Sequence, residues 1–134
     1  MPKITTATIR QRKAAREKVV VLTAYDVAFA RLADKAGVDI VLVGDTLGMV
    51  VQGHPSTLPV TVEEMAYHGR MVARGVSNAH VVVDLPFMSY QASIEDGMRS
   101  AGHLMKNGGA ESVKLEGGEE VAEPLRGRPP VLTI

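Results

Sequence analysis

The sequence IVLVGD, at residues 40–45, decides the fold, because it joins a short β-branched apolar run to a glycine and a carboxylate. A continuous apolar run of this length is typical of a strand in a parallel sheet. Similar runs occur at residues 19–23, 80–83 and 112–115. The sequence therefore predicts four strands of one sheet, the first of them buried on both faces.

The segments between these runs carry the pattern of covering helices. Residues 26–36 place their polar side chains on one helical stripe, as a helix on the surface of a sheet does. A second helix is expected to begin at Thr61, where Glu64 completes a capping-box pattern, and Ser93 with Asp96 repeats this pattern for a third. Strands that alternate with helices favour βαβ units and a parallel sheet, either open and doubly wound or closed into a barrel.

Three further segments are assigned from their composition. The basic residues 1–18 are expected to form a solvated helix; a transit peptide is the alternative, and Glu17 argues against it. Residues 44–59 contain several Gly and Pro residues and are expected to form a long loop that covers a site. Near the end, a short helix broken near Pro124 and a fifth strand at residues 131–134 are expected.

The overall composition excludes several classes of protein. The 134 residues are 46% hydrophobic with 15 basic and 15 acidic residues, which predicts one soluble globular unit without general attraction to nucleic acid or anionic membranes. The chain has no cysteine, which excludes a disulfide framework, a thiolate zinc site and a cysteine nucleophile. No apolar run approaches the roughly 20 residues of a membrane-spanning helix, and a cytoplasmic location is expected.

Three of the predicted strands are followed by a carboxylate, namely Asp45, Asp84 and Glu116. In parallel α/β sheets the ligand site lies outside the carboxyl ends of the strands, so these side chains are expected to meet at one edge. Three carboxylates repel one another unless a cation lies between them, and oxygen ligands favour Mg²⁺ over zinc. For each acid alone, a turn residue or a helix cap is the simpler explanation, but their recurrence favours a metal site.

Lys114 strengthens the prediction of a polar site. It lies two residues before Glu116 in a largely apolar strand, so both side chains face the same side of the sheet. Such a lysine needs a partner, which an acidic site or an anionic substrate supplies. A structural ion pair with an aspartate is the alternative. Tyr25, just after the first strand, and His54, in the long loop, are further candidates for contacts at this site.

Five stretches of the sequence resemble the ketopantoate hydroxymethyltransferase family, whose members are also called 3-methyl-2-oxobutanoate hydroxymethyltransferases. The similarity runs from about residue 4 to residue 118, in order and with matching spacing. Together these motifs are highly specific. They are LTAYD at residues 22–26, VGDTLGM at 43–49, QGH and STLPVT within 52–61, DLPFMSY at 84–90 and VKLEGG at 113–118.

The resemblance implies a parallel (β/α) barrel of the phosphoenolpyruvate/pyruvate type. It also implies one-carbon transfer from 5,10-methylenetetrahydrofolate to 3-methyl-2-oxobutanoate, in pantothenate and coenzyme A biosynthesis, by a homo-oligomer. By the same resemblance Asp45 and Asp84 bind Mg²⁺ directly and Glu116 belongs to the metal site through water. The positions of Asp45, Thr46, Asp84 and Lys114 are those that contact the keto acid. A cation held by these acids suits the chemistry, since it stabilises an enolate.

The chain departs from the family in two respects. Thr46 stands where the family usually has serine, which keeps the hydroxyl and adds a methyl group. A barrel of eight βα units takes about 250 residues, whereas this chain reaches only the expected fifth strand. We therefore expect about half a barrel, as one partial domain over residues 1–134 in which 119–134 diverge from the family. The glutamate that the family uses as general base has no counterpart here, and no catalytic residue is assigned.

Three functions remain in competition at this point. The first is the hydroxymethyltransferase reaction of the resembling family. The second is a non-catalytic half-barrel that self-assembles and at most binds metal and keto acid, because open strand edges and uncovered apolar faces favour association. The third is a carbon–carbon lyase of the same superfamily that acts on a small 2-oxo acid. The QGH and DLPF motifs disfavour this third function.

Overall fold

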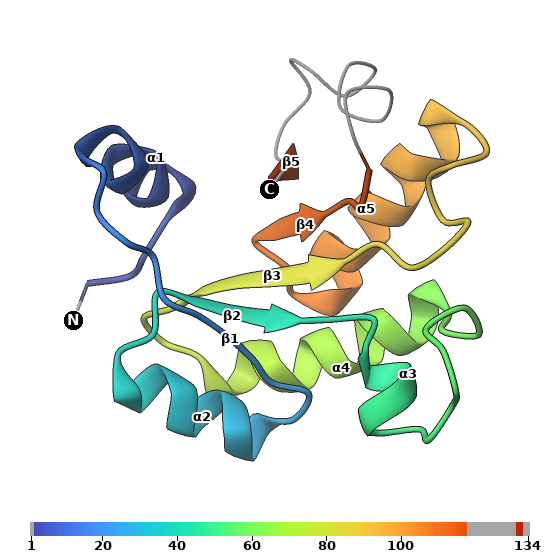
Figure 1. Ribbon diagram of the computed structural model, residues 1–134, viewed down its shortest axis with the longest axis horizontal. Helices are drawn as coiled ribbons and strands as arrows, with labels where there is room; N and C mark the ends of the chain where they lie inside the picture. The colour runs from blue at the N-terminus through green and yellow to red at the C-terminus, as the bar shows by residue number, and fades with distance from the viewer. Residues whose placement is uncertain (1, 118–130, 133–134) are drawn as a thin grey trace.

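The computed structural model of the chain describes residues 2–117 and 131–132. Its strands form one five-stranded sheet in the order β1-β2-β3-β4-β5, in which every neighbouring pair is parallel (Figure 1). The predicted parallel α/β architecture is therefore confirmed, with each strand beside the one that precedes it in the sequence. The strands are β1 (Val21–Thr23), β2 (Ile40–Val43), β3 (His80–Asp84), β4 (Ser112–Lys114) and β5 (Val131–Leu132).

Three of the helices cover one face of this sheet, and α4 lies between α2 and α5 (Figure 1). Val41, Val43 and Val83 of the sheet form the core together with Met65 of α4 and Leu104 of α5. No helix in the described ranges is long and apolar enough to cross a membrane. The helix expected near Pro124 lies outside the described residues. The helices are α1 (Thr6–Ala15), α2 (Val27–Ala36), α3 (Leu47–Val50), α4 (Val62–Gly75) and α5 (Ile94–Gly108).

The two predicted helix starts are confirmed, with one difference in their hydrogen bonding. The Thr61 hydroxyl accepts the N–H of Glu64 at 3.2 Å, and the Glu64 carboxylate accepts the N–H of Thr61 at 2.8 Å, which completes the capping box of α4. Ser93 likewise accepts the N–H of Asp96 at 3.1 Å and so caps α5. The Asp96 carboxylate, however, accepts the Ser93 hydroxyl at 2.7 Å rather than its backbone N–H, so this box is only half formed.

The prediction that the first strand is buried on both faces is wrong. β1 begins at Val21 and forms one edge of the sheet, where Val21 and Leu22 are 45% and 50% exposed. A β-branched run is compatible with burial, but burial itself requires neighbours on both sides of the strand. In the described part of the chain β1 has only β2 beside it.

The segment predicted as a long loop is partly helical. It begins with the single turn of α3, after which the N–H of His54 donates to the carbonyl of Gly48 at 2.8 Å. Gly48 also permits close packing, because a Cβ at this position would lie 2.5 Å from Cγ2 of Val60. The Gln52 amide then donates to the Glu64 carboxylate at 2.8 Å. These contacts fix the loop against the start of α4.

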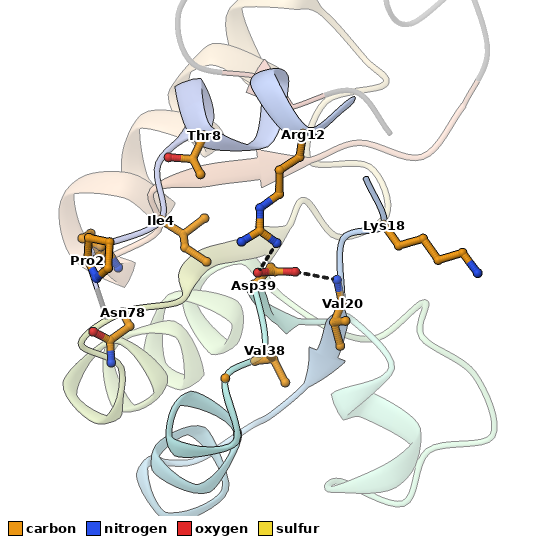
Figure 2. A pocket seen from close by; sticks show the side chains of 11 residues that line it. Pro2, Ile4, Thr8, Arg12, Lys18, Val20, Val38, Asp39 and Asn78 are labelled. Atoms are coloured by element: carbon orange, nitrogen blue, oxygen red, sulfur yellow. Dashed lines mark hydrogen bonds and ion pairs between the residues drawn. The ribbon is translucent and has the colours of Figure 1, made fainter. Parts of the chain in front are cut away.

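The surface helix expected near the N-terminus is α1, and it lies at the amino ends of the strands (Figure 1). Arg12 forms an ion pair of 2.6 Å with Asp39, whose other oxygen accepts the N–H of Val20 at 2.9 Å (Figure 2). The N–H of Ile4 donates to the carbonyl of Asn78 at 2.7 Å. These residues line a cavity of about 470 Å³ (Figure 2). The cavity is at the opposite end of the strands from the predicted site residues.

A buried carboxylate joins α2 to the turn before β3. Asp34 accepts the backbone N–H groups of Ser77, Asn78 and Ala79 at 3.1, 2.9 and 2.7 Å. Burial raises the pKa of Asp34, but these hydrogen bonds outweigh burial, and the pKa lies below its usual value. The ionised carboxylate thus satisfies three backbone donors of a tight turn at once.

Candidate functional site

Asp84 and Lys114 are neighbours at the carboxyl end of the sheet. They are the last residues of β3 and β4 and are paired in the register of those strands. The Nζ atom of Lys114 lies 2.9 Å from Oδ1 of Asp84, and their side chains are 26% and 7% exposed. The parallel register therefore brings a buried anion and a partly buried cation together.

The two carboxylate oxygens of Asp84 have different neighbours. Oδ2 accepts the N–H of Asp45 at 3.3 Å. Oδ1 is buried and, within the described residues, receives no aligned hydrogen bond, although the Lys114 ammonium is within ion-pair distance. Burial raises the pKa of Asp84, and the ion pair with the Lys114 ammonium opposes this rise. A buried oxygen of this kind is costly unless another group binds it.

The segment after β2 brings Thr46 close to the same carboxylate. A Cβ on Gly44 would lie 2.8 Å from Oγ1 of Thr46 and 3.6 Å from Oδ2 of Asp84, so only glycine permits this approach. Tyr25, which follows β1, shares a hydrogen bond of 2.8 Å with the Thr46 hydroxyl. The expected contact of Tyr25 at this edge of the sheet is therefore present.

Glu116 follows β4 and is held through its backbone by a residue that sequence reasoning missed. The Tyr90 hydroxyl donates to the carbonyl of Glu116 at 2.6 Å and accepts its N–H at 3.0 Å. The Glu116 residue itself is exposed. Tyr90 stands within the DLPFMSY stretch, but a contact between residues 26 apart has no local sequence signal.

The structure tests whether these acids suit a metal ion. Among residues 2–117 and 131–132, no three Asp, Glu or His side chains are close enough to hold a metal ion as they stand. Asp45, Asp84 and Glu116 nonetheless follow three neighbouring strands, and one oxygen of Asp84 is buried without an aligned donor. Carboxylate oxygens are the ligands that Mg²⁺ takes. The chemistry of these oxygens therefore suits a hard divalent cation, but the structure does not bring the three predicted carboxylates together, and the metal site stays a prediction.

The histidines differ in their relation to this edge. His54 is exposed and lies near Glu64, whose pKa is lowered chiefly by the hydrogen bond from the backbone N–H of Thr61. His68 of α4 is half-buried, and its Nδ1 atom lies 2.7 Å from the carbonyl oxygen of Tyr25. His68 therefore supports a residue of the candidate site, which its helical position alone did not indicate.

Solved structures share the fold of the chain. One is the structure of oxaloacetate acetylhydrolase in complex with the inhibitor 3,3-difluorooxalacetate. The alignment covers 86% of this chain and 39% of that one, with a TM-score of 0.61 and 17% identity. Another is the structure of 2,3-dimethylmalate lyase, a PEP mutase/isocitrate lyase superfamily member. The alignment covers 90% of this chain and 43% of that one, with a TM-score of 0.63 and 20% identity. These likenesses show the fold of the chain, which is part of a parallel α/β barrel.

Curated relatives are much more similar in sequence. The 3-methyl-2-oxobutanoate hydroxymethyltransferase of Syntrophus aciditrophicus is 56% identical over 124 residues, which are 92% of this chain and 46% of that protein. The enzyme of the same name from Anaeromyxobacter sp. is 57% identical over 128 residues, which are 92% of this chain and 42% of that protein. The chain spans somewhat less than half the length of these relatives.

A family model gives the same assignment over nearly the whole chain. The model of ketopantoate hydroxymethyltransferase matches residues 3–127. The match includes every residue of the candidate site and extends beyond residue 118, where the resemblance in the motifs ends. On the strength of this match and of relatives more than half identical, the chain belongs to the ketopantoate hydroxymethyltransferase family.

Proposed function

We propose that this chain forms the metal- and keto acid-binding half of a 3-methyl-2-oxobutanoate hydroxymethyltransferase. The reaction is transfer of a one-carbon unit from 5,10-methylenetetrahydrofolate to 3-methyl-2-oxobutanoate, which gives 2-dehydropantoate for pantothenate synthesis. The observation that carries the proposal is the buried Oδ1 of Asp84, which lies beside Lys114 without an aligned hydrogen-bond donor in the described residues. The cytoplasm is the compartment expected for this reaction.

Asp45, Asp84 and Glu116 are the residues that would hold the metal, which we take to be Mg²⁺. Their oxygens match its preference for hard ligands, and their charges would be neutralised by it. A bound Mg²⁺ supplies positive charge that stabilises the enolate of the keto acid. Burial keeps the local dielectric constant low at Asp84, which strengthens its attraction for any cation.

Lys114 and Thr46 are the residues that would bind the keto acid itself. The ammonium of Lys114 lies beside Asp84 and can pair with a substrate carboxylate while it remains near the aspartate. The Thr46 hydroxyl is exposed at the same edge, where it can donate to the substrate. Together they would orient the substrate carboxylate at the carboxyl ends of the strands.

Deprotonation of the keto acid is the step to which we assign no residue of this chain. Removal of the C3 proton requires a general base, and we assign none here. We expect the base and part of the folate-binding surface to lie in the part of the relatives that extends beyond this match. The chain covers 46% of one such relative. A homo-oligomer is the expected assembly.

The test is thermal unfolding with Mg²⁺ and 3-methyl-2-oxobutanoate. Ligands that bind only the folded state raise the melting temperature, so wild type should be stabilised by the pair more than by either ligand alone. Asp84→Asn should abolish this shift, while Asp26→Asn, at the exposed start of α2, should retain it. Equal shifts in wild type and Asp84→Asn would refute the assignment of the site.

A non-catalytic, self-associating half-barrel is the second candidate function. It is favoured by the edge strand β1, in which Leu22 is 50% exposed, and by Val20 just before this strand, which is 55% exposed. An unpaired apolar edge promotes association between chains. Exchange of the C3 proton into deuterated water, followed by NMR, separates the two functions. Exchange no faster than with Mg²⁺ alone, together with a concentration-dependent oligomer in size-exclusion chromatography, would favour this second function.

A further inference from the structure

A chain of three side chains links α4 to the candidate keto acid site. The Tyr25 hydroxyl lies 2.8 Å from Oγ1 of Thr46. Behind it, Nδ1 of His68 lies 2.7 Å from the backbone oxygen of Tyr25, which fixes Nδ1 as the protonated ring nitrogen. The three residues come from the ends of β1 and β2 and from the middle of α4, so they are not neighbours in the sequence.

Burial does not require the contact between Tyr25 and Thr46. Thr46 is exposed and Tyr25 is half-buried, so water could satisfy either hydroxyl. The Thr46 hydroxyl is nevertheless directed over Gly44, where even a Cβ would be only 2.8 Å from it. The hydroxyl is thus held on the side of the strand end that carries Asp84, rather than left to rotate.

We propose that Tyr25 is a positioning residue that fixes the Thr46 hydroxyl for a bound 2-oxo acid, and that His68 holds Tyr25 in place for this task. The inference rests on the proposed function and deepens it. A hydroxyl has one proton and two acceptor lone pairs. When Oγ1 of Thr46 accepts a hydrogen bond from the Tyr25 hydroxyl, the Thr46 hydroxyl can still donate its own hydrogen bond to the substrate carboxylate.

The direction of these hydrogen bonds follows from the charge of the ligand. An anionic carboxylate accepts but does not donate, so its binding selects the order Tyr25 to Thr46 to carboxylate. Successive hydrogen bonds of this kind polarise one another. Tyr25 therefore contributes to binding without touching the ligand, and its contribution depends on the hydroxyl of Thr46.

The experiment measures the dissociation constant of 3-methyl-2-oxobutanoate by calorimetry at saturating Mg²⁺. Thr46→Val should weaken binding by about tenfold, which corresponds to loss of one hydrogen bond to a charged group, and Tyr25→Phe should weaken it by at most the same factor, because it only releases the Thr46 hydroxyl from its fixed direction. The double variant should bind no more weakly than Thr46→Val alone, because Tyr25 acts through Thr46. Tyr67→Phe is the matched control, since Tyr67 is an exposed tyrosine of α4 and should bind as wild type does.

His68 provides the second, independent set of variants. His68→Asn keeps a donor near the carbonyl of Tyr25 and should restore most of the binding that His68→Leu loses. The ligand-free melting temperatures of all the variants separate positioning from folding. They should stay close to wild type for Tyr25→Phe, and loss of binding that tracked a lower melting temperature would overturn the inference.

The remaining outcomes distinguish this inference from the proposed function. If wild type binds the keto acid and Tyr25→Phe binds it equally well, the positioning role is refuted while the function stands. If Tyr25→Phe and Thr46→Val weaken binding additively, the two hydroxyls act separately, and the coupling is refuted. If wild type itself does not bind, the proposed function fails, and this inference fails with it.

Discussion

The hydroxyl of Tyr90 makes both backbone hydrogen bonds of Glu116, donating to its carbonyl at 2.6 Å and accepting its N–H at 3.0 Å. A side chain from the loop after β3 thus takes the place that a neighbouring strand would occupy beyond the end of β4. Ser89 steadies this loop, because its hydroxyl donates to the carbonyl of Pro86 at 2.6 Å. The position of Glu116 therefore depends on a tyrosine hydroxyl rather than on strand pairing.

Tyr90→Phe should destabilise the protein by about 1–2 kcal/mol, because it leaves a backbone N–H and a carbonyl without their partner. The loss should appear as a lower urea midpoint with an unchanged denaturant slope. Tyr67→Phe removes a hydroxyl from an exposed tyrosine and should shift the midpoint little. Equal midpoints for the Tyr90 and Tyr67 variants would show that solvent replaces both hydrogen bonds of Glu116.

Lys114→Met should destabilise the protein by about 2 kcal/mol near neutral pH. The substitution leaves the charge of Asp84 buried without a counterion, and the partial exposure of Lys114 reduces the cost below that of a fully buried pair. Because burial raises the pKa of Asp84, the folded state binds its proton more tightly than the unfolded state does. The stability that Asp84 contributes by binding this proton is present below pH 3.8, and it is lost as the pH rises through the pKa of Asp84 in the folded state.

Removal of Lys114 should raise this pKa further, so the difference between wild type and Lys114→Met should be larger at pH 8 than at pH 4. Urea unfolding at the two pH values measures it. Lys114→Arg keeps the positive charge and should lose less stability than Lys114→Met at pH 8. A destabilisation that is the same at both pH values would mean that Lys114 contributes packing rather than charge.

The structure explains why Asp84 and Lys114 were predictable from sequence while their surroundings were not. Each residue stands at the carboxyl end of an apolar run. Parallel strands place their carboxyl ends at the same edge of the sheet, whatever their side-chain contacts are. The exposure of Leu22 depends on what lies beside β1, which no local pattern contains. The roles of Tyr90 and His68 likewise depend on partners far away in the sequence.

Asp34→Ala should cost about 3 kcal/mol at pH 7, because it leaves the backbone N–H groups of residues 77–79, of which that of Ala79 is buried, without their acceptor. The pKa of Asp34 is lowered in the folded state, so its contribution is present above pH 3.8 and is lost as the pH falls through the folded pKa. The cost of the substitution should therefore be smaller at pH 2.5 than at pH 7.

Asp26→Ala supplies the matched comparison for Asp34→Ala. Asp26 accepts the N–H groups of Ala28 and Phe29 at 2.8 and 2.9 Å as the exposed cap of α2. Its loss should cost about 1 kcal/mol. Thermal or urea unfolding of both variants at pH 7 measures the difference. A smaller effect for Asp34→Ala than for Asp26→Ala would contradict the assigned role of the buried carboxylate.

His80 should make the protein less stable as the pH falls below 6.5. It is buried in β3, where Nε2 lies 2.8 Å from the hydroxyl of Ser112. Burial lowers its pKa, and the charge of Glu111 offsets part of this effect. The unfolded state therefore binds a proton at His80 at a higher pH than the folded state does. The free energy of unfolding is highest above pH 6.5 with respect to this group and declines as the pH falls below 6.5.

His80→Gln removes this titration and retains a side-chain amide that can reach Ser112. The stability of the variant, measured by urea unfolding from pH 7.5 to 5, should depend less on pH than that of wild type. His103→Gln, on the outer part of α5, is the control and should leave the pH dependence unchanged. If His80→Gln and wild type have parallel pH profiles, another group is responsible for the acid-induced loss.

The order of the strands also bears on how the protein is made. Because β1 to β5 lie side by side in the order of the sequence, each strand can pair with one that has already left the ribosome. Every new strand then closes only one crossover connection at a time, and the entropic cost of closure grows only slowly with its length. The edge of β1 is the exception, because none of β2 to β5 lies on its outer side, and Leu22 is 50% exposed there. During synthesis this apolar edge stays open while the later strands pair, which makes it the natural contact for chaperones.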